Sequence, residues 1–526
     1  MTKGWAQPAD RVQPALTEPA AQGVIAALGG PMGRFAQIGR GRWWTPLRAI
    51  IAVAWVFLAL GALAKSNCAR GKLVDGALQL NWDGNRQYTS FCYNDIVPLY
   101  GGRGLDQPGF VYDYSWVEGD LTRYMEYPVL GGLFQGLMGW IARNTYPLMN
   151  WALPESGWYF YVTAFVMALI WVGTARMVAE LAGNRIWDTI LVVASPLLIM
   201  HAFTNWDIPS IAFMVGALLA ARNKKFWLAG VLIGFGTAFK MWPLFLLGAY
   251  LVIALRQKNL VPFLKMLAAT VVSWLVVNVP IMLRNYDAWH EFQRLNTERG
   301  WEWTTIYAVI SRATGWTGFD SGEGAPVILN AVTLVLFLSG CLFVLIAGLK
   351  APQMPRVAEL FVLIVGFFLL FNKVWSPQYS LWLVIPAVLA LPYWRLLLTW
   401  MTADMLVWPI LMWHMMGTEN LGLPGGALNL IVLIRDGLIV AIMVLVVRQM
   451  YGHRPDKVRD AHYGCDPLLT TPTDWEEAKQ QWELQPSLES APSSSPSDSS
   501  VPASGQSSRK SRWASPSHSA SWPSSS

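Results

Sequence analysis

Long apolar runs constrain this chain more than any other feature. Between residues 46 and 452 the sequence is a succession of apolar stretches, several of them long enough to form a transmembrane helix. A helix of about 20 apolar residues spans the hydrocarbon core of a bilayer, where unpaired backbone groups are too costly for open structures. Only 14% of the residues are charged, against about 25% in soluble domains. The sequence therefore predicts an all-α polytopic membrane protein.

Basic residues beside the apolar runs predict its orientation, because Lys and Arg accumulate on the cytoplasmic side. Arg34, Arg40, Arg42 and Arg48 precede the first run, so we expect the N-terminus to be cytoplasmic. The same rule, applied along the chain, gives about twelve crossings of the plasma membrane and a cytoplasmic C-terminus. This topology accounts for the net charge of +6, which gives no reason to expect a nucleic-acid partner.

Three runs need separate treatment. The run 226–255 lies between two basic flanks, so we predict a hairpin of two short helices that turns near Lys240 and Pro243 on the outer side. The run 127–143 has both ends outside, so it is predicted to lie along the outer interface or to dip into the membrane and return. The run 186–203 is predicted to cross once, toward the outside.

The chain divides into three parts. Residues 1–45 form a polar cytoplasmic arm, too long a lead for a cleaved signal peptide, so the first span is predicted to be a retained anchor. Residues 46–452 form the membrane domain, with a first outer loop at 66–157 and a second at 285–325. The tail 453–526 is hydrophilic and ends in Ser and Pro, a composition that predicts disorder and leaves a cytoplasmic partner open.

Several polar residues that a membrane-spanning helix does not need are concentrated on the predicted outer face. Asp95 lies among apolar and aromatic residues in "FCYNDIVPLYGGRGL". Asp207 ends "FTNWD", Lys240 lies in "FKMWP" and Arg299 in "LNTERGWEWTTIY". A carboxylate can accept the proton of an attacking hydroxyl, and Lys or Arg can neutralise a phosphate. We expect these side chains to converge on one cavity.

Each of these residues has a structural alternative. Asp207 precedes an apolar run, which is equally typical of a helix N-cap. Lys240 interrupts a long apolar run, and an intramembrane ionisable residue indicates function, unless its amine reaches water at the tip of the hairpin. Asp404, Arg435 and Asp436 lie inside apolar runs, where we interpret them as structural charges that offset one another.

The cysteines add one further prediction. Cys68 and Cys92 both fall in the first outer loop, where an extracytoplasmic location permits a disulfide. Cys341 lies in an apolar run and is interpreted as a packing residue. Cys and His show no spacing typical of a metal site, and the sequence leaves a metal requirement open.

Five phrases occur in the order found in a known family. They are "NDIVPLYGGRGL", "YMEYPVL", "TNWDIPSIAFMVGALLAAR", "LAGVLIGFGTAFKMWPLFLL" and "VWSPQYSLWLVIP". Together they resemble glycosyltransferase family 87, the actinobacterial polyprenyl-phosphomannose-dependent mannosyltransferases of the GT-C class of membrane glycosyltransferases. Val129 replaces the second Pro of the family's phrase, which suggests a different acceptor.

The resemblance implies a reaction and a site. A GT-C-like fold would transfer a sugar, typically mannose, from a polyprenyl-phosphate donor to a hydroxyl of a cell-envelope glycolipid or glycan outside the membrane, with inversion. Asp95 would be the general base, and Lys240, followed by Arg299, would bind the donor phosphate. No cofactor is firmly implied. The residues that would shape the sugar and lipid sites are Tyr127, Asp207, Gln378 and Tyr379.

Two other functions stay open. A transporter or lipid flippase predicts internal repeats and polar residues near the bilayer midplane. No repeat is visible, although Asp404, Arg435 and Asp436 favour that function. A scaffold for envelope assembly, acting through the Ser/Pro-rich tail, is the third hypothesis. Deletion of the tail would leave an enzyme active and a scaffold inactive.

Overall fold

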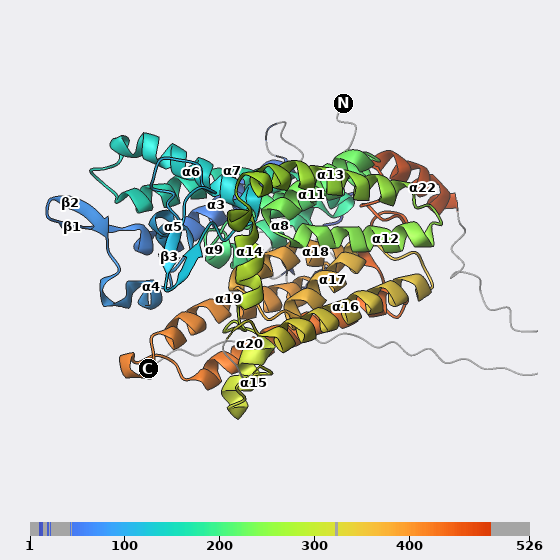
Figure 1. Cartoon of the computed structure of the whole chain (residues 1–526). Helices are drawn as coiled ribbons and strands as arrows, with labels where there is room; N and C mark the ends of the chain where they lie inside the picture. Colours follow the sequence, from blue (N-terminus) through green and yellow to red (C-terminus); the bar gives the residue numbers. More distant parts are fainter. Residues whose placement is uncertain are drawn as a thin grey trace, which may run out of the picture. The chain divides into compact units, whose positions relative to one another are not determined.

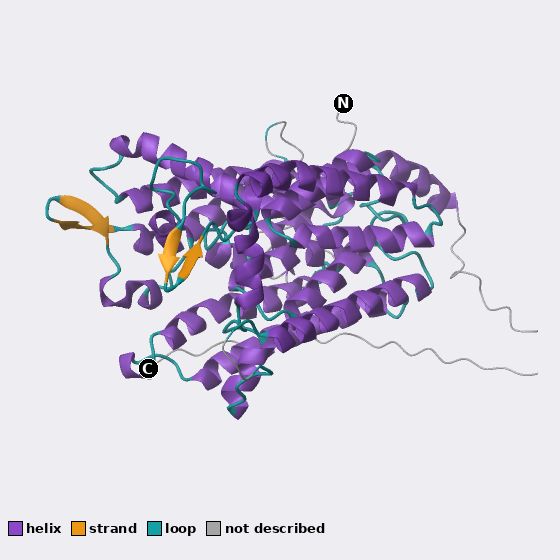
Figure 2. Cartoon of the chain, viewed as in Figure 1, coloured by secondary structure: helices purple, strands orange, loops and turns teal. Residues whose placement is uncertain are grey.

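The computed structural model describes residues 45–320 and 324–484, together with 10–13, 18–19, 21–22 and 43. Contacts divide the chain into a unit Met1–Trp482 and a unit Glu483–Ser526, and the fold described below is that of the first unit. Helices dominate it, with two small strand pairs (Figure 2). Most of the arm and residues 485–526 of the predicted disordered tail lie outside the described residues.

In the part of the chain that the structure describes, six helices are long and apolar enough to span a membrane, which confirms the polytopic all-α class. They are α3 (Pro46–Ser66), α7 (Glu155–Leu181), α13 (Val261–Arg284), α16 (Val327–Lys350), α19 (Trp394–Met415) and α20 (Gly425–Met450). Shorter apolar helices are α10 (Ile208–Arg222), α11 (Phe226–Phe239), α12 (Leu246–Arg256), α17 (Val357–Phe371) and α18 (Leu381–Ala390). The number of twelve crossings stays a prediction.

The predicted hairpin near Lys240 is present. Helix α11 ends at Phe239, Lys240 adopts an extended backbone, and the 3-10 turn η6 (Trp242–Phe245) leads into α12. Two glycines let α11 pack closely against α13, because a Cβ at Gly230 would collide with the carbonyl of Met266, and one at Gly234 with the Ser273 hydroxyl. This packing fixes the place where Lys240 leaves the helix.

The run 186–203 does not form the single span that its apolar sequence predicts. It is divided into η5 (Gly183–Asp188), α8 (Thr189–Val193) and α9 (Pro196–His201). Ser195 accepts a hydrogen bond from the N–H of Leu197 and so caps α9, whose first residue is Pro196. Proline cannot continue a helix but suits its first turn, which explains the break.

The loop 66–157 carries the only strands in the described part of the chain. Strands β1 (Gly71–Val74) and β2 (Ala77–Leu80) form one antiparallel pair, and β3 (Trp116–Glu118) and β4 (Leu121–Arg123) form another. These strands lie near α5 and α6, away from α22 (Figure 1). The short helices and turns of this loop are η2 (Asn67–Ala69), η3 (Asp83–Asn85), α4 (Arg86–Thr89), α5 (Ile96–Gly102), α6 (Val129–Thr145) and η4 (Tyr146–Leu148).

Helix α6 occupies the run predicted to lie along the interface. Leu137 and Trp140 on this helix are 51% and 57% exposed, as expected for side chains that face lipid headgroups. The predicted disulfide is also present, since Cys68 and Cys92 are joined with a Cα–Cα distance of 5.5 Å. The remaining elements are α14 (Tyr286–Glu298), α15 (Ile306–Thr314), η7 (Pro377–Ser380), η8 (Thr418–Asn420), α21 (Lys457–Asp460) and α22 (Pro472–Leu484).

The start of the tail differs from the predicted disorder. Residues 457–484 contain α21 and α22, and their segment is tied to the membrane helices by charged groups. Asp456 lies 2.7 Å from the Nε of Arg356, and Asp466 accepts the N–H of Val357 at 3.0 Å. Arg356 is fully buried, and a buried charge needs such partners. The hydrophilic residues after 453 supply them.

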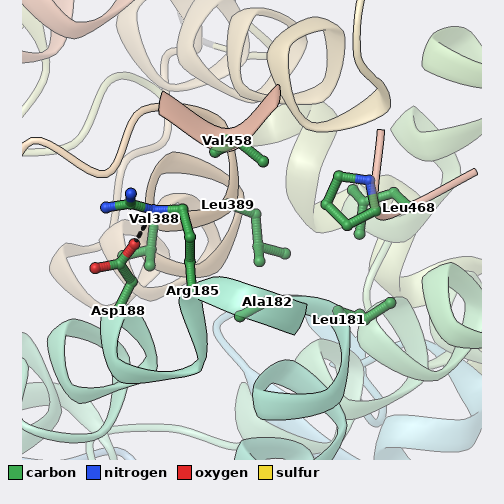
Figure 3. A pocket seen from close by; sticks show the side chains of 9 residues that line it. Leu181, Ala182, Arg185, Asp188, Val388, Leu389, Val458 and Leu468 are labelled. Atoms are coloured by element: carbon green, nitrogen blue, oxygen red, sulfur yellow. Dashed lines mark hydrogen bonds and ion pairs between the residues drawn. The ribbon is translucent and has the colours of Figure 1, made fainter. Parts of the chain in front are cut away.

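A small cavity lies near this segment (Figure 3). Arg185 and Asp188, both on η5, pair at 2.6 Å on one side of it, and apolar side chains such as Val388 and Leu468 form other parts of its wall. Its volume of about 10 Å³ has room for one water molecule at most. It cannot hold a sugar or a lipid phosphate, so the candidate site lies elsewhere.

Candidate active site

Asp95 is held in place from two sides. Its backbone N–H donates to the carbonyl of Thr204 at 2.8 Å, and its Oδ2 accepts from the Nδ2 of Asn205 at 2.7 Å. The chain just before it is fixed to α3, because the buried Lys65 donates to the carbonyl of Tyr93 at 2.9 Å. The disulfide joins Cys92 to the end of the same helix. Asp95 is therefore a preorganised carboxylate.

Asn205 connects this carboxylate to a cation. Its Nδ2 also donates to the hydroxyl of Tyr127 at 2.8 Å, and its Oδ1 accepts from the Nζ of Lys240 at 3.1 Å. Asp95 and Lys240 thus share one amide without forming a direct ion pair. Asn205 lies in the phrase "TNWD", but nothing in the sequence marks it as a site residue, because an uncharged amide carries no signal of charge or hydropathy.

Lys240 and Asp207 form a buried ion pair of 2.9 Å and are 8% and 1% exposed. The Nε1 of Trp382 donates to the same Asp207 oxygen at 2.8 Å. Asp207 occupies the N-cap position of α10, but its side chain accepts no helix N–H, so capping is not what its carboxylate does. The amine of Lys240 is turned inward, so the alternative of a lysine that reaches water is wrong as well.

The predicted site residues converge on one cavity of about 730 Å³, here called the large cavity. It is lined by Asp95, Tyr127, Lys240, Arg299, Gln378 and Tyr379. Asp207 accepts a hydrogen bond from Lys240 but does not itself line the large cavity. The side chains come from segments far apart in the sequence, as predicted, while their individual roles stay predictions.

Further cations line the large cavity. Arg103 pairs with Glu126 at 2.7 Å, and Arg123 pairs with Glu291 at 3.3 Å. Lys373 differs from both, since its Nζ donates to the carbonyl of Arg299 and no carboxylate lies within 4.0 Å of it among the described residues. Burial, followed by the charge of Arg299, lowers the pKa of Lys373 to about 8. Its charge is therefore open to an anionic ligand.

Two carboxylates have a raised affinity for a proton: Asp95 at the wall of the large cavity, and Glu302 beside Arg299. Burial raises the pKa of Asp95, while hydrogen bonds from Asn205 and Tyr93 act in the opposite direction. Burial also raises the pKa of Glu302, opposed by the Arg299 charge. A raised pKa makes a carboxylate a better proton acceptor as long as it is ionised at the working pH.

The charges inside α20 are neutralised locally. The Nε of Arg435 lies 2.9 Å from Asp436 Oδ1, and its Nη2 donates to the carbonyl of Thr304 at 2.6 Å. This supports the structural interpretation of the pair. Among the described residues, no group of three or more His, Cys, Asp or Glu side chains is placed to hold a metal ion.

The sequence from Tyr127 to Asn372 matches the model of a known family, described as Glycosyltransferase family 87. This segment belongs to glycosyltransferase family 87. The resemblance inferred from the five phrases is confirmed, and the chain is a multi-pass membrane glycosyltransferase. The family 87 segment includes Tyr127, Asp207, Lys240 and Arg299, whereas Asp95 and the phrase with Gln378 lie outside it.

One similar solved structure is the crystal structure of ArnT from Cupriavidus metallidurans bound to undecaprenyl phosphate. The likeness covers 78% of this chain and 79% of that chain, with 13% identity and a TM-score of 0.37. Assignment to family 87 depends on the sequence match and not on this likeness. No curated protein matches the chain.

Proposed function

We propose that this membrane glycosyltransferase moves mannose from a polyprenyl-phosphate donor to a hydroxyl of a cell-envelope glycolipid or glycan on the extracytoplasmic face, with inversion. One observation carries the proposal. Asp95 and Lys240 contact opposite atoms of the Asn205 amide at the wall of a single cavity. A proton acceptor and a cation are therefore held at fixed places beside the same space.

The large cavity suits a lipid-linked donor. Its cations can neutralise a phosphate, while Phe245, Phe368 and Leu99 supply apolar wall for the first part of a prenyl chain. The hydroxyls of Tyr127 and Tyr379 and the amide of Gln378 can bind sugar hydroxyls. The volume of about 730 Å³ lies within the range of about 300–1,000 Å³ typical of ligand sites.

In the proposed step, Asp95 takes the proton of the acceptor hydroxyl. The acceptor oxygen then forms a bond to the anomeric carbon, and the bond between that carbon and the phosphate oxygen breaks. The electron pair of the broken bond leaves with the polyprenyl phosphate. Attack from the face opposite the leaving group inverts the configuration. Fixed charges aimed at the departing group lower the barrier, since they need no reorganisation.

Three cations can receive the phosphate charge. Lys240 lies nearest to the Asp95–Asn205 pair, but Asp207 offsets part of its charge. Arg299 is 3.6 Å from Glu302, and the amine of Lys373 is bonded only to backbone carbonyls in the described chain. We assign the phosphate to the space bounded by these three residues.

The choice of mannose and of the outer face depends on the sequence. The five family phrases support mannose, and the distribution of basic residues supports an extracytoplasmic site. The transporter alternative loses part of its support, since Arg435 is tied to Asp436 and to loop backbone and does not line the large cavity.

The test uses full-length protein in lipid nanodiscs with radiolabelled polyprenyl-phosphomannose and a membrane glycolipid extract. We expect transfer from this donor, none from a nucleotide-linked mannose, and inverted configuration in the product by NMR. Failure to transfer any polyprenyl-linked sugar would contradict the proposal and favour transport.

A further inference from the structure

A second cavity adjoins the large cavity at Asp95. Its volume is about 350 Å³, and it is here called the aromatic cavity. The residues that line both cavities are Tyr93, Asp95, Arg299, Ser376 and Gln378. The carboxylate of Asp95 thus lies where the two spaces meet, which is where a base must lie if donor and acceptor occupy different spaces.

The walls of the two cavities differ in charge. Arg103, Arg123, Lys240 and Lys373 line the large cavity alone, as do Glu118 and Glu126, which pair with Arg123 and Arg103 and leave the cations in excess. In the aromatic cavity Arg299 is the one cation among the described lining residues, and Glu302 lies beside it. A phosphate is therefore attracted to the large cavity, and a neutral ligand suits the aromatic cavity better.

Aromatic rings make up much of the remaining wall. They belong to Tyr88, Tyr93, Trp303, Trp375 and Trp408. Rings of this kind offer a large apolar face with a polar edge, which matches the apolar face of a sugar ring. Trp303 is 52% exposed, so about half of its side chain is open to contact with a ligand.

Glu302 supplies the polar contact that a sugar needs. Its side chain accepts from the hydroxyl of Ser376 at 2.9 Å, and its backbone N–H donates to the carbonyl of Lys373 at 2.9 Å. An ionised carboxylate has about four acceptor positions, so oxygen lone pairs remain for hydroxyl donors. Its negative charge at the same time repels an anionic ligand.

The wall around Glu302 is fixed before any ligand binds. The hydroxyl of Thr304 donates to the carbonyl of Trp375 at 2.5 Å, and Arg435 donates to the carbonyl of Thr304 at 2.6 Å. The Cζ of Arg435 lies 3.4 Å from the centre of the Trp375 ring. The loop with Glu302 and the loop with Ser376 are therefore joined, and they can orient an acceptor at little entropic cost.

We infer that the aromatic cavity is the acceptor subsite, and that it takes a neutral sugar ring whose attacking hydroxyl faces Asp95. Trp303 stacks on the ring, and Glu302 accepts hydrogen bonds from its other hydroxyls and excludes uronic acids. Glu302 is thus the residue that determines acceptor specificity. This inference rests on the proposed function, because it divides donor and acceptor between the two cavities.

The test uses octyl mannoside and octyl glucuronide as acceptor probes, with the full-length protein in nanodiscs. For Glu302→Gln and Trp303→Ala we expect the KM for octyl mannoside to rise roughly 10-fold or more, with the donor KM within about twofold of wild type. Glu302→Gln should also gain relative activity toward octyl glucuronide, a change in charge selectivity that a merely structural role does not produce. Matched controls are Glu419→Gln and Trp227→Ala, both at exposed positions outside the two cavities.

A photoreactive octyl mannoside gives a readout that does not depend on catalysis. We expect it to label peptides of the aromatic cavity, such as 303–304 and 411–415, and less so in Glu302→Gln. Labelling of 292–297 in the large cavity, or variants that change the donor KM instead, would overturn the assignment. If the wild type is labelled in the aromatic cavity but transfers no sugar, the proposed function fails and the sugar site stands.

Discussion

The Nδ2 of Asn205 lies 2.7 Å from the Oδ2 of Asp95, and the other end of the same amide accepts from Lys240. A neutral side chain therefore sets the position of the base and its distance from the cation. This contact also favours the ionised form of Asp95, against the effect of burial.

Replacement of Asn205 should change the pH profile of transfer. Asp95 must be ionised to act, so activity falls as the pH drops through its raised pKa. Asn205→Ala removes a hydrogen bond that lowers that pKa, so the acid limb should move to higher pH, and kcat should fall roughly 10- to 100-fold. Asn223→Ala, at an exposed position after α10, is the control. An unmoved acid limb would show that Asn205 does not tune the base.

Lys373 should control the alkaline limb. Its pKa of about 8 means that its positive charge is present below that pH and is lost as the pH rises through it. Transfer should therefore decline above about pH 8. Lys373→Arg keeps its charge at any working pH and should extend activity upward, whereas Lys373→Met should raise the donor KM below about pH 8, where the wild-type amine is charged. The control is Lys350→Arg on the exposed end of α16; if both arginine variants keep the wild-type profile, Lys373 does not bind the phosphate.

The ion pair of Lys240 and Asp207 should contribute to folding as well as to catalysis. Lys240→Met leaves Asp207 buried without its cation, which should cost about 3–5 kcal/mol of stability. The double variant with Asp207→Asn should regain thermal stability but not transfer activity. Thermal melting and initial rates measure the two effects separately. Full recovery of transfer in the double variant would remove Lys240 from the catalytic machinery.

The disulfide should hold the loop of Asp95 in place. Cys68 and Cys92 are 24 residues apart, and closure of a loop of this length stabilises a protein by about 3 kcal/mol. We expect Cys68→Ser to lower both the melting temperature and kcat, with little change in KM. Cys465→Ser, which removes a free thiol, should change neither, and an unaltered kcat in Cys68→Ser would mean that the disulfide is not needed to position Asp95.

The sequence predicted correctly those site residues that stand out as charged side chains among apolar neighbours. Asp95, Lys240 and Arg299 were found because membrane helices do not need them, and the structure brings them to one cavity. Asn205 could not be found in this way, since its importance comes from three contacts made across the fold.

The prediction of helices from the sequence is limited in the same way, because contacts made across the fold are not visible in it. Long apolar runs such as that of α16 were predicted correctly, because length and hydropathy determine them. The run 186–203 is also mainly apolar, yet Ser195 and Pro196 begin a new helix within it. The helices after residue 456 were missed because their hydrophilic sequence gives no sign of the buried Arg356 that they partner.

The most direct test of the central claim compares Asp95→Asn with Asp113→Asn, which changes an exposed carboxylate of the same loop that pairs with Arg284. Both variants are assayed for mannose transfer from polyprenyl-phosphomannose and for donor binding in nanodiscs. Asp95→Asn should lower kcat by about 10²-fold or more while donor binding is kept, and Asp113→Asn should transfer at the wild-type rate. Undiminished transfer by Asp95→Asn would contradict its role as the base.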